Sequence, residues 1–201
     1  MTAVKEGFDI VAVGASAGGF DALCTLLARL PADFEIPIAI VQHRAKESEG
    51  LAGLLQDCTR LRVLEAEDKE TLERGTIYVA PPDYHMLVEE GTLALSTEGL
   101  VGYSRPSIDV FFESCADVYG PRAIGVVLTG ANADGANGLK RIVERGGQAL
   151  VQDPRTAEVS VMPASAQRLV PRARVLTLEE IAAHLAERDR LHRRSQRSRV
   201  S

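Results

Sequence analysis

The stretch DIVAVGASAGG at residues 9–19 decides the fold of this chain, and FDALCTLLAR follows it at residues 20–29. In its first five residues, Asp9 is followed by the apolar run IVAV (10–13), which is typical of a buried strand. Residues 20–29 carry apolar side chains at helical spacing, and a glycine-rich turn lies between the two parts. This order predicts a strand, a tight turn and a helix, which together open a β–α unit.

The rest of the chain repeats this alternation. Apolar runs predict strands at residues 36–41, 63–66, 77–80, 123–128 and 148–152, and amphipathic stretches predict helices at 51–59, 108–119 and 136–145 and from 177 onward. Residues 86–89 and 92–96, joined through Glu90-Gly91, predict a hairpin. Strands that alternate with helices and are apolar on both faces imply a covered parallel sheet. We therefore predict an α/β fold, a doubly wound and mostly parallel sheet with an antiparallel β-hairpin and helices on both faces.

Length and composition are those of one globular domain. The chain has 201 residues, of which 45% are hydrophobic and 25% charged, and its formal net charge is −5. No charge-free stretch exceeds eleven residues, whereas a membrane-spanning helix needs about twenty, so we expect no membrane insertion. The N-terminus lacks the apolar core of a signal peptide, which favours a cytoplasmic protein.

The C-terminal end differs in charge from the rest. From residue 186 onward there are six arginines against Glu187 and Asp189, which gives this end a charge of +4. We predict one domain over residues 1–187 and a basic Arg/Ser-rich tail over 188–201. A solvated tail is favoured over one that contacts nucleic acid, lipid or an acidic partner, and nothing in the body of the chain indicates a nucleic-acid partner.

The cysteines and two of the histidines are interpreted as residues without a chemical role. Cys24, Cys58 and Cys115 are odd in number and lack CxxC spacing, which favours buried or incidental thiols over a disulfide or metal framework. His184 and His192 fall on the terminal helix and tail, where we expect them on the surface. The sequence indicates neither a metal ion nor an organic cofactor.

Ser16, inside the glycine-rich turn, allows two interpretations. A dinucleotide-binding GxGxxG fingerprint would need glycine in place of Ser16 and an acidic residue at the end of the second strand, where His43 stands. The pattern GxSxG is that of a nucleophile elbow, in which the glycines permit a sharp turn that exposes a serine hydroxyl. A structural turn before a helix is also common, so this motif alone leaves catalysis open.

Two more predicted strand ends carry residues that could activate a serine. His43 follows the second strand and could act as a base, with His85 as its one serious rival. Asp134 follows the strand at 123–128 and could orient the imidazole, although such a residue is often only a turn or cap. Because carboxyl ends of parallel strands meet at one edge, the three positions predict a Ser-His-Asp triad. Their order differs from that of α/β-hydrolases, which indicates another α/β sheet.

These residues belong to motifs by which the chain resembles the catalytic domain of CheB-type protein-glutamate methylesterases. The resemblance extends over roughly residues 8–185. The matching segments are VGASAGG (13–19), QH (42–43), IYVAPPDYHM (77–86), RPSIDVFF (105–112), LTG to DGA (128–136) and VMPASA (161–166).

The resemblance implies the same fold and a catalytic triad of Ser16, His43 and Asp134. It implies hydrolysis of glutamate γ-methyl esters on the cytoplasmic helices of chemoreceptors, with release of methanol and deamidation of receptor glutamines. The expected partner is a methylated chemoreceptor or a receptor-like signalling protein. The backbone N–H groups of Ala17 and Ala131 are the expected donors to the oxyanion.

The surroundings of the triad are less well defined by the pattern. We expect His85 and Arg105 to line the substrate groove. The chain departs from the family pattern at five positions beside the site, namely Ala17, Arg44, Ala45, Ala131 and Asn132. Ala131 and Asn132 affect the shape of the aspartate loop and its contacts with substrate, Ala17 retains a backbone N–H, and Arg44 adds a charge beside the site.

The sequence leaves undecided how the activity is regulated, and it allows two alternative functions. The family usually carries a receiver domain before the catalytic one, and the residues before Ser16 are too few for it. We therefore expect any control to act through a separate regulatory protein. The alternatives are a broader ester or amide hydrolase with the same triad, and a non-catalytic docking module for signalling proteins.

Overall fold

The computed structural model describes residues 9–45, 48 and 50–197. Its strands are β1 (Ile10–Ala15), β2 (Ile38–Gln42), β3 (Arg62–Glu65), β4 (Thr76–Val79), β5 (His85–Glu89), β6 (Thr92–Ser96), β7 (Ala123–Val127), β8 (Gln148–Gln152) and β9 (Arg174–Leu176). Its helices are α1 (Gly19–Leu27), α2 (Leu51–Gln56), α3 (Ile108–Tyr119), α4 (Ala136–Glu144), α5 (Val161–Leu169) and α6 (Leu178–Arg197), with a 3-10 turn at Gly120–Arg122.

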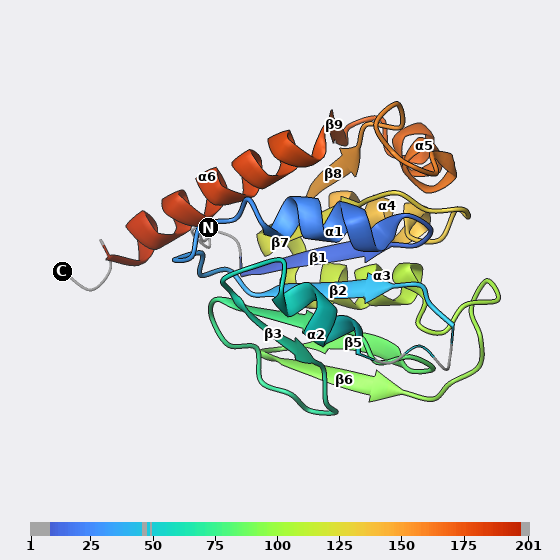
Figure 1. Ribbon diagram of the computed structural model, residues 1–201, viewed down its shortest axis with the longest axis horizontal. Helices are drawn as coiled ribbons and strands as arrows, with labels where there is room; N and C mark the ends of the chain where they lie inside the picture. Colours follow the sequence, from blue (N-terminus) through green and yellow to red (C-terminus); the bar gives the residue numbers. More distant parts are fainter. Residues whose placement is uncertain (1–8, 46–47, 49, 198–201) are drawn as a thin grey trace.

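Within the described residues, seven parallel strands form one sheet in the order β3-β4-β2-β1-β7-β8-β9, and β5 and β6 form an antiparallel hairpin (Figure 1). From β1 the chain passes to the neighbouring strand β2, then to the edge strand β3 and back to β4, which lies between β2 and β3. It later crosses to β7 on the other side of β1. The carboxyl ends of β1, β2 and β7 therefore adjoin the point where the winding reverses, which is where open α/β sheets bind ligands. The predicted fold class is confirmed.

Side chains of β1 alternate between two cores, as the period of a strand requires. Val11 and Val13 pack with α1, α2 and α6 on one face of the sheet. Ile10 and Ala12 pack with α3, α4, α5 and the hairpin on the other face. Because all four side chains are fully buried, β1 is the centre of a three-layer structure, as Figure 1 shows.

Two elements were not predicted from the sequence. Helix α5 has a proline at its third residue and buries polar Ser165 beside Met162, so its apolar periodicity is weak. Strand β9 has only three residues and lies at the edge of the sheet. The other predicted elements are present, with ends that shift by up to three residues, such as the helix from Leu51, which ends at Gln56.

The C-terminal segment differs from the prediction of a solvated tail. The expected helix start is present, since Thr177 N–H donates to Glu180 Oε2 and Glu180 N–H donates to Thr177 Oγ1. Helix α6 then continues to Arg197, whereas residues 198–201 lie outside the described part. His184 and His192, predicted on the surface, are buried instead. Apolar residues of α6 pack against α1, and this long helix therefore belongs to the folded body.

Asp189 fixes the far end of α6 to the segment before β2. Its side chain has 0% exposure. Oδ1 accepts hydrogen bonds from the backbone N–H groups of Glu35 (2.9 Å) and Ile36 (3.1 Å). Arg193 Nε lies 3.0 Å from Oδ2 as an ion-pair partner. A buried carboxylate with these partners explains why a charge-rich segment is ordered here.

Replacing Asp189 with alanine should lower the free energy of unfolding by about 3 kcal/mol, because two backbone N–H groups lose their acceptor and Arg193 loses one of its two ion-pair partners and keeps only Asp33. The variant Asp189→Asn should lose less, since its amide oxygen can still accept. Urea unfolding followed by circular dichroism measures both. Equal losses in the two variants would contradict this role for the oxygen.

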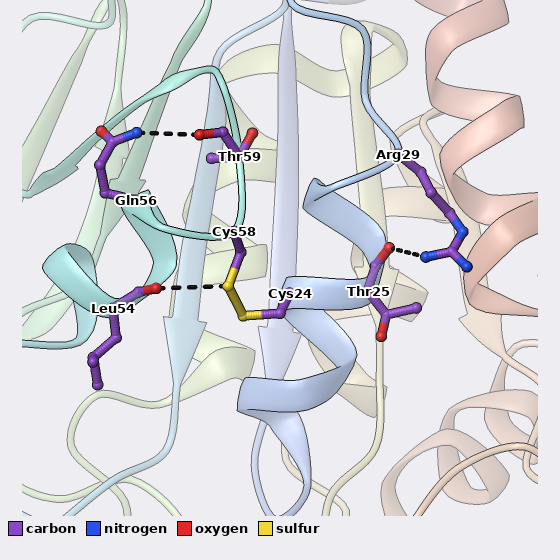
Figure 2. Close-up of a disulfide and its surroundings, with 7 residues drawn as sticks. All are labelled: Cys24, Thr25, Arg29, Leu54, Gln56, Cys58 and Thr59. Atoms are coloured by element: carbon purple, nitrogen blue, oxygen red, sulfur yellow. Dashed lines mark hydrogen bonds between the residues drawn. A yellow bond between two sulfur atoms is a disulfide. The ribbon is translucent and has the colours of Figure 1, made fainter.

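The prediction for the cysteines is wrong for two of them. Cys24 in α1 and Cys58, just after α2, form a disulfide with an S–S distance of 2.07 Å, shown in Figure 2. They lie 34 residues apart in the chain, and packing of α1 and α2 on one face brings their Cα atoms to 5.1 Å. No local spacing reveals such a pair. Cys115 is a buried free thiol, and burial raises its pKa to about 12.

Reduction of the disulfide should lower the free energy of unfolding by about 4 kcal/mol, because a crosslink across this length of chain restricts the unfolded ensemble. Urea unfolding with and without dithiothreitol measures the effect. The double variant Cys24→Ser/Cys58→Ser should resemble the reduced protein and should not respond to the reductant. A wild-type midpoint that reductant leaves unmoved would contradict the expectation.

Candidate active site

Ser16 begins the turn that connects β1 to α1. Its backbone N–H donates to Thr129 O (3.0 Å), which binds the turn to the segment after β7. Gly18 has a φ of 72° and caps α1, a left-handed conformation that glycine adopts without strain. The side chain of Ser16 is half-buried, while Ala17 next to it is exposed. The turn therefore presents the hydroxyl at the carboxyl end of the sheet.

Gln42 joins the Ser16 turn to the segment that carries His43. Its Nε2 donates to Ser16 O (2.7 Å) and to His43 O (3.1 Å). Gly19 makes room for this side chain, since a Cβ there would lie 2.0 Å from Gln42 Oε1. The two glycines that end the motif thus have separate reasons, a left-handed turn at Gly18 and a close approach of Gln42 at Gly19.

His43 follows β2 and contacts Asp134, which follows β7. The His43 backbone N–H donates to Ala15 O (2.9 Å), so the base is bound to the strand that precedes Ser16. Its Nε2 lies 2.8 Å from Asp134 Oδ2. Their side chains are only 13% and 9% exposed, which shields this contact from water. The predicted histidine and aspartate are therefore brought together.

The N-terminus of α3 surrounds the Asp134 carboxylate. Ser107 Oγ donates to Oδ1 (3.0 Å), Ile108 N–H to Oδ2 (2.7 Å) and Asp109 N–H to Oδ1 (2.9 Å). Burial raises the pKa of Asp134, but the hydrogen bonds from His43, Ile108 and Asp109 outweigh it and hold this pKa below its usual value. The side chain is therefore an ionised acceptor at neutral pH.

The ionised Asp134 determines the tautomer of His43. A carboxylate only accepts, so His43 Nε2 carries the proton and Nδ1 carries the in-plane lone pair. Asn132 agrees with this assignment, because its Oδ1 accepts from Asp134 N–H (3.1 Å) and its Nδ2 then faces His43 Nδ1 at 3.4 Å. Nδ1 is therefore the nitrogen that can accept a proton.

A cavity of about 480 Å³ opens beside these groups. Its lining includes Ser16, His43 and Asn132, together with Leu100 and Tyr103. Among the described residues, no hydrogen bond joins Ser16 Oγ to His43, and such contacts often form only with substrate bound. The serine hydroxyl and the imidazole thus face one space that a substrate can enter.

Ala17 and Ala131, the expected oxyanion donors, are both exposed, and each is the chain neighbour of a residue that lines the cavity. In the described part of the chain, neither backbone N–H donates to a protein acceptor. Both are therefore available to a ligand. Their role as donors to an oxyanion stays a prediction.

His85 does not line the cavity, which corrects the expectation for this residue. It is 2% exposed, its Nε2 contacts Gly99 O (3.0 Å), and its Nδ1 accepts from Ser107 N–H (3.1 Å). These two contacts use both ring nitrogens, so His85 supports the start of α3 from within the core.

Arg105 lines the cavity, as expected, and so does Arg44. Arg105 binds Asp83 with an Nη2–Oδ1 distance of 2.6 Å and donates to the carbonyls of Thr97 and Glu98. Arg44 pairs with Glu65 at 3.0 Å. Since each guanidinium has an acidic partner, neither presents an uncompensated charge to a ligand.

Sequence reasoning gave no role in the site to three residues that the structure brings there. Gln42 and Ser107 appeared only within matching segments, and Asn132 only as a departure from a pattern. Each acts through contacts between segments far apart in the chain. The signal that could have indicated the partners of Asp134 is the helix-capping type of residue at Ser107, because the N-terminus of a helix stabilises a carboxylate.

Within the described part of the chain, no group of three His, Cys, Asp or Glu residues is placed to hold a metal ion. In the same part of the chain, no helix has the length and apolar character needed to cross a bilayer.

Comparisons with known proteins agree with this geometry. The family model of the CheB methylesterase matches residues 11–185. A Leptospira interrogans protein, provisionally named protein-glutamate methylesterase/protein-glutamine glutaminase, is 49% identical over 177 residues, which cover 87% of this chain and 92% of that protein. Protein-glutamate methylesterase FrzG of Myxococcus xanthus is 42% identical over 182 residues, which cover 90% of this chain and 54% of FrzG.

A solved structure has the same fold. The crystal structure of the Thermotoga maritima CheB methylesterase catalytic domain matches with a TM-score of 0.85 and 32% identity, and the match covers 90% of this chain and 98% of that one. The family match extends over most of the chain and includes the segments that carry Ser16, His43 and Asp134. The chain therefore belongs to the CheB methylesterase family.

Proposed function

We propose that this chain is a serine hydrolase that removes γ-methyl esters from glutamate side chains, with Ser16 as nucleophile, His43 as base and Asp134 as the residue that orients the base. The observation that carries the proposal is the position of His43. Asp134 holds its Nε2 at 2.8 Å, and its Nδ1 lone pair remains for the serine proton. The cavity beside them is lined by Ser16 and open to a substrate side chain.

The reaction follows from these positions. Ser16 Oγ attacks the ester carbonyl carbon while its proton passes to His43 Nδ1. Negative charge develops on the carbonyl oxygen, where the backbone N–H groups of Ala17 and Ala131 are the proposed donors. The C–O bond then breaks, and Nδ1 returns its proton to the methoxy oxygen, so methanol leaves. Water then hydrolyses the acyl-serine by the same route. This step restores Ser16 and leaves the substrate with a glutamate side chain in its carboxylate form.

The proposed substrate is a methylated chemoreceptor or a receptor-like signalling protein in the cytoplasm. The family match and the relatives named protein-glutamate methylesterase support this class of substrate. Several relatives are also named protein-glutamine glutaminase, and the same steps would deamidate glutamine with ammonia as the leaving group. Control through a separate regulatory protein is part of this proposal.

Substitution of Ser16 by alanine should abolish methanol release from a methylated receptor fragment and should prevent labelling by a fluorophosphonate, because the attacking oxygen is lost. The matched control is Ser104→Ala, which removes a hydroxyl from the lining of the same cavity. That variant should still be labelled. Methanol release by Ser16→Ala above a few per cent of the wild-type rate would refute the nucleophile.

The variant Asp134→Asn should lower kcat by about 10⁴-fold, the effect known for the same change in a triad of this kind. Its carboxamide would present an N–H to His43 Nε2, so the imidazole proton would move to Nδ1 and block the base. Thermal unfolding should show a folded protein. The control Asp83→Asn changes a carboxylate in the same cavity that is bound to Arg105 and should cost less than tenfold. Similar losses in both variants would count against orientation of His43.

A further inference from the structure

The side-chain amide of Asn132 has one orientation beside His43. Its Oδ1 accepts from Asp134 N–H at 3.1 Å, so its Nδ2 is the atom that lies 3.4 Å from His43 Nδ1. An amide nitrogen only donates, and it has two N–H groups. Among the described hydrogen bonds, Nδ2 makes only this one. Asn132 also lines the cavity together with Ser16.

This contact has to end during the reaction. Nδ1 has a single lone pair in the ring plane, and the hydroxyl of Ser16 needs that lone pair to give up its proton. Once Nδ1 is protonated it becomes a donor, and a donor does not pair with Asn132 Nδ2. At 3.4 Å the hydrogen bond is already longer than the usual range for a nitrogen donor, so little is lost when it breaks. Nδ2 then needs another acceptor on the same side of the ring.

The leaving group arrives at this place. Protonated Nδ1 must donate to the leaving atom, so that atom lies within hydrogen-bond distance of Nδ1 and beside Asn132 Nδ2. Resting on the methylesterase activity proposed above, we propose that Asn132 is a specificity-determining residue, which favours a methyl ester over a glutamine amide by donating a hydrogen bond to the leaving oxygen.

The two leaving groups differ in lone pairs. The methoxy oxygen of the tetrahedral intermediate has two, so one can take the proton from His43 Nδ1 while the other accepts from Asn132 Nδ2. The C–O bond breaks and methanol leaves. The leaving nitrogen of the glutamine intermediate has one lone pair, which takes the proton from Nδ1 as the C–N bond breaks and ammonia leaves. Its N–H groups then face the donor Nδ2, so Asn132 gives the amide no hydrogen bond.

The experiment compares the two leaving groups on one peptide. A peptide with a glutamate γ-methyl ester and the same peptide with glutamine are given to the full chain, and kcat/KM is measured from methanol and ammonia release. Asn132→Ala should lower kcat/KM for the ester about tenfold, equal to about 1.4 kcal/mol, and should leave the value for the amide unchanged or higher. The ester-to-amide ratio should therefore fall at least tenfold.

A second variant keeps the contact of Asn132 with the loop and changes only the donor. Asn132→Asp retains an oxygen for Asp134 N–H but places an acceptor where Nδ2 was, so its ester-to-amide ratio should fall below that of Asn132→Ala. The matched control is Asn137→Ala, which removes an exposed amide bound to Asp109 outside the cavity. The control should keep the wild-type ratio.

The outcomes separate this inference from the function on which it rests. An ester-to-amide ratio for Asn132→Ala within twofold of wild type would overturn the role of Asn132 while leaving the methylesterase in place. If wild type releases no measurable ammonia, a loss of less than twofold in kcat/KM for the ester overturns it in the same way. Methanol release that persists in Ser16→Ala would refute the proposed function itself.

Discussion

The carboxylate of Asp134, held at the N-terminus of α3, is the contact on which the geometry of the site depends. Hydrogen bonds from His43, Ile108 and Asp109 keep it ionised in spite of burial, and its contact with Nε2 fixes the tautomer of His43. In all, three donors at the N-terminus of α3 surround it. Ser107 contributes one of these donors, and its own backbone N–H is bound by His85 from the hairpin. The hairpin, α3, the loop after β7 and β2 are thus linked through one series of hydrogen bonds. A change in the core near His85 can reach the base without touching the cavity.

The main features of fold and site could be predicted because they depend on local patterns. Apolar runs long enough for strands alternate with helical stretches, and this alternation allows few topologies other than a parallel sheet with helices on both faces. Ser16, His43 and Asp134 were predicted because each lies in the loop or turn that follows one of these runs. The rule that carboxyl ends of parallel strands meet then placed three residues, far apart in the chain, at one edge.

The features that the sequence did not reveal depend on packing between elements. The Cys24–Cys58 disulfide needs α1 and α2 on the same face of the sheet, and nothing in the spacing of the cysteines indicates this. In the sequence, Asp189 is one charged residue in an Arg-rich segment that is typical of a solvated tail. In the structure it is buried and accepts hydrogen bonds from two backbone N–H groups. His85 was the right type of residue at a strand, yet both of its nitrogens are used within the core. Composition alone cannot distinguish a solvated charge from one that a buried backbone requires.

The orientation of the His43 ring has a consequence for reagents that modify active-site histidines. In chymotrypsin-type triads the aspartate binds Nδ1 and the serine faces Nε2. In this chain Asp134 covers Nε2, and Nδ1 is the nitrogen at the cavity. An alkylating electrophile that enters the cavity therefore meets Nδ1. This nitrogen is more hindered, because the Cβ of His43 is attached to the ring carbon next to it. Inhibitor scaffolds shaped for the less hindered Nε2 of proteases are consequently poor starting points for this enzyme, and compact electrophiles are better ones.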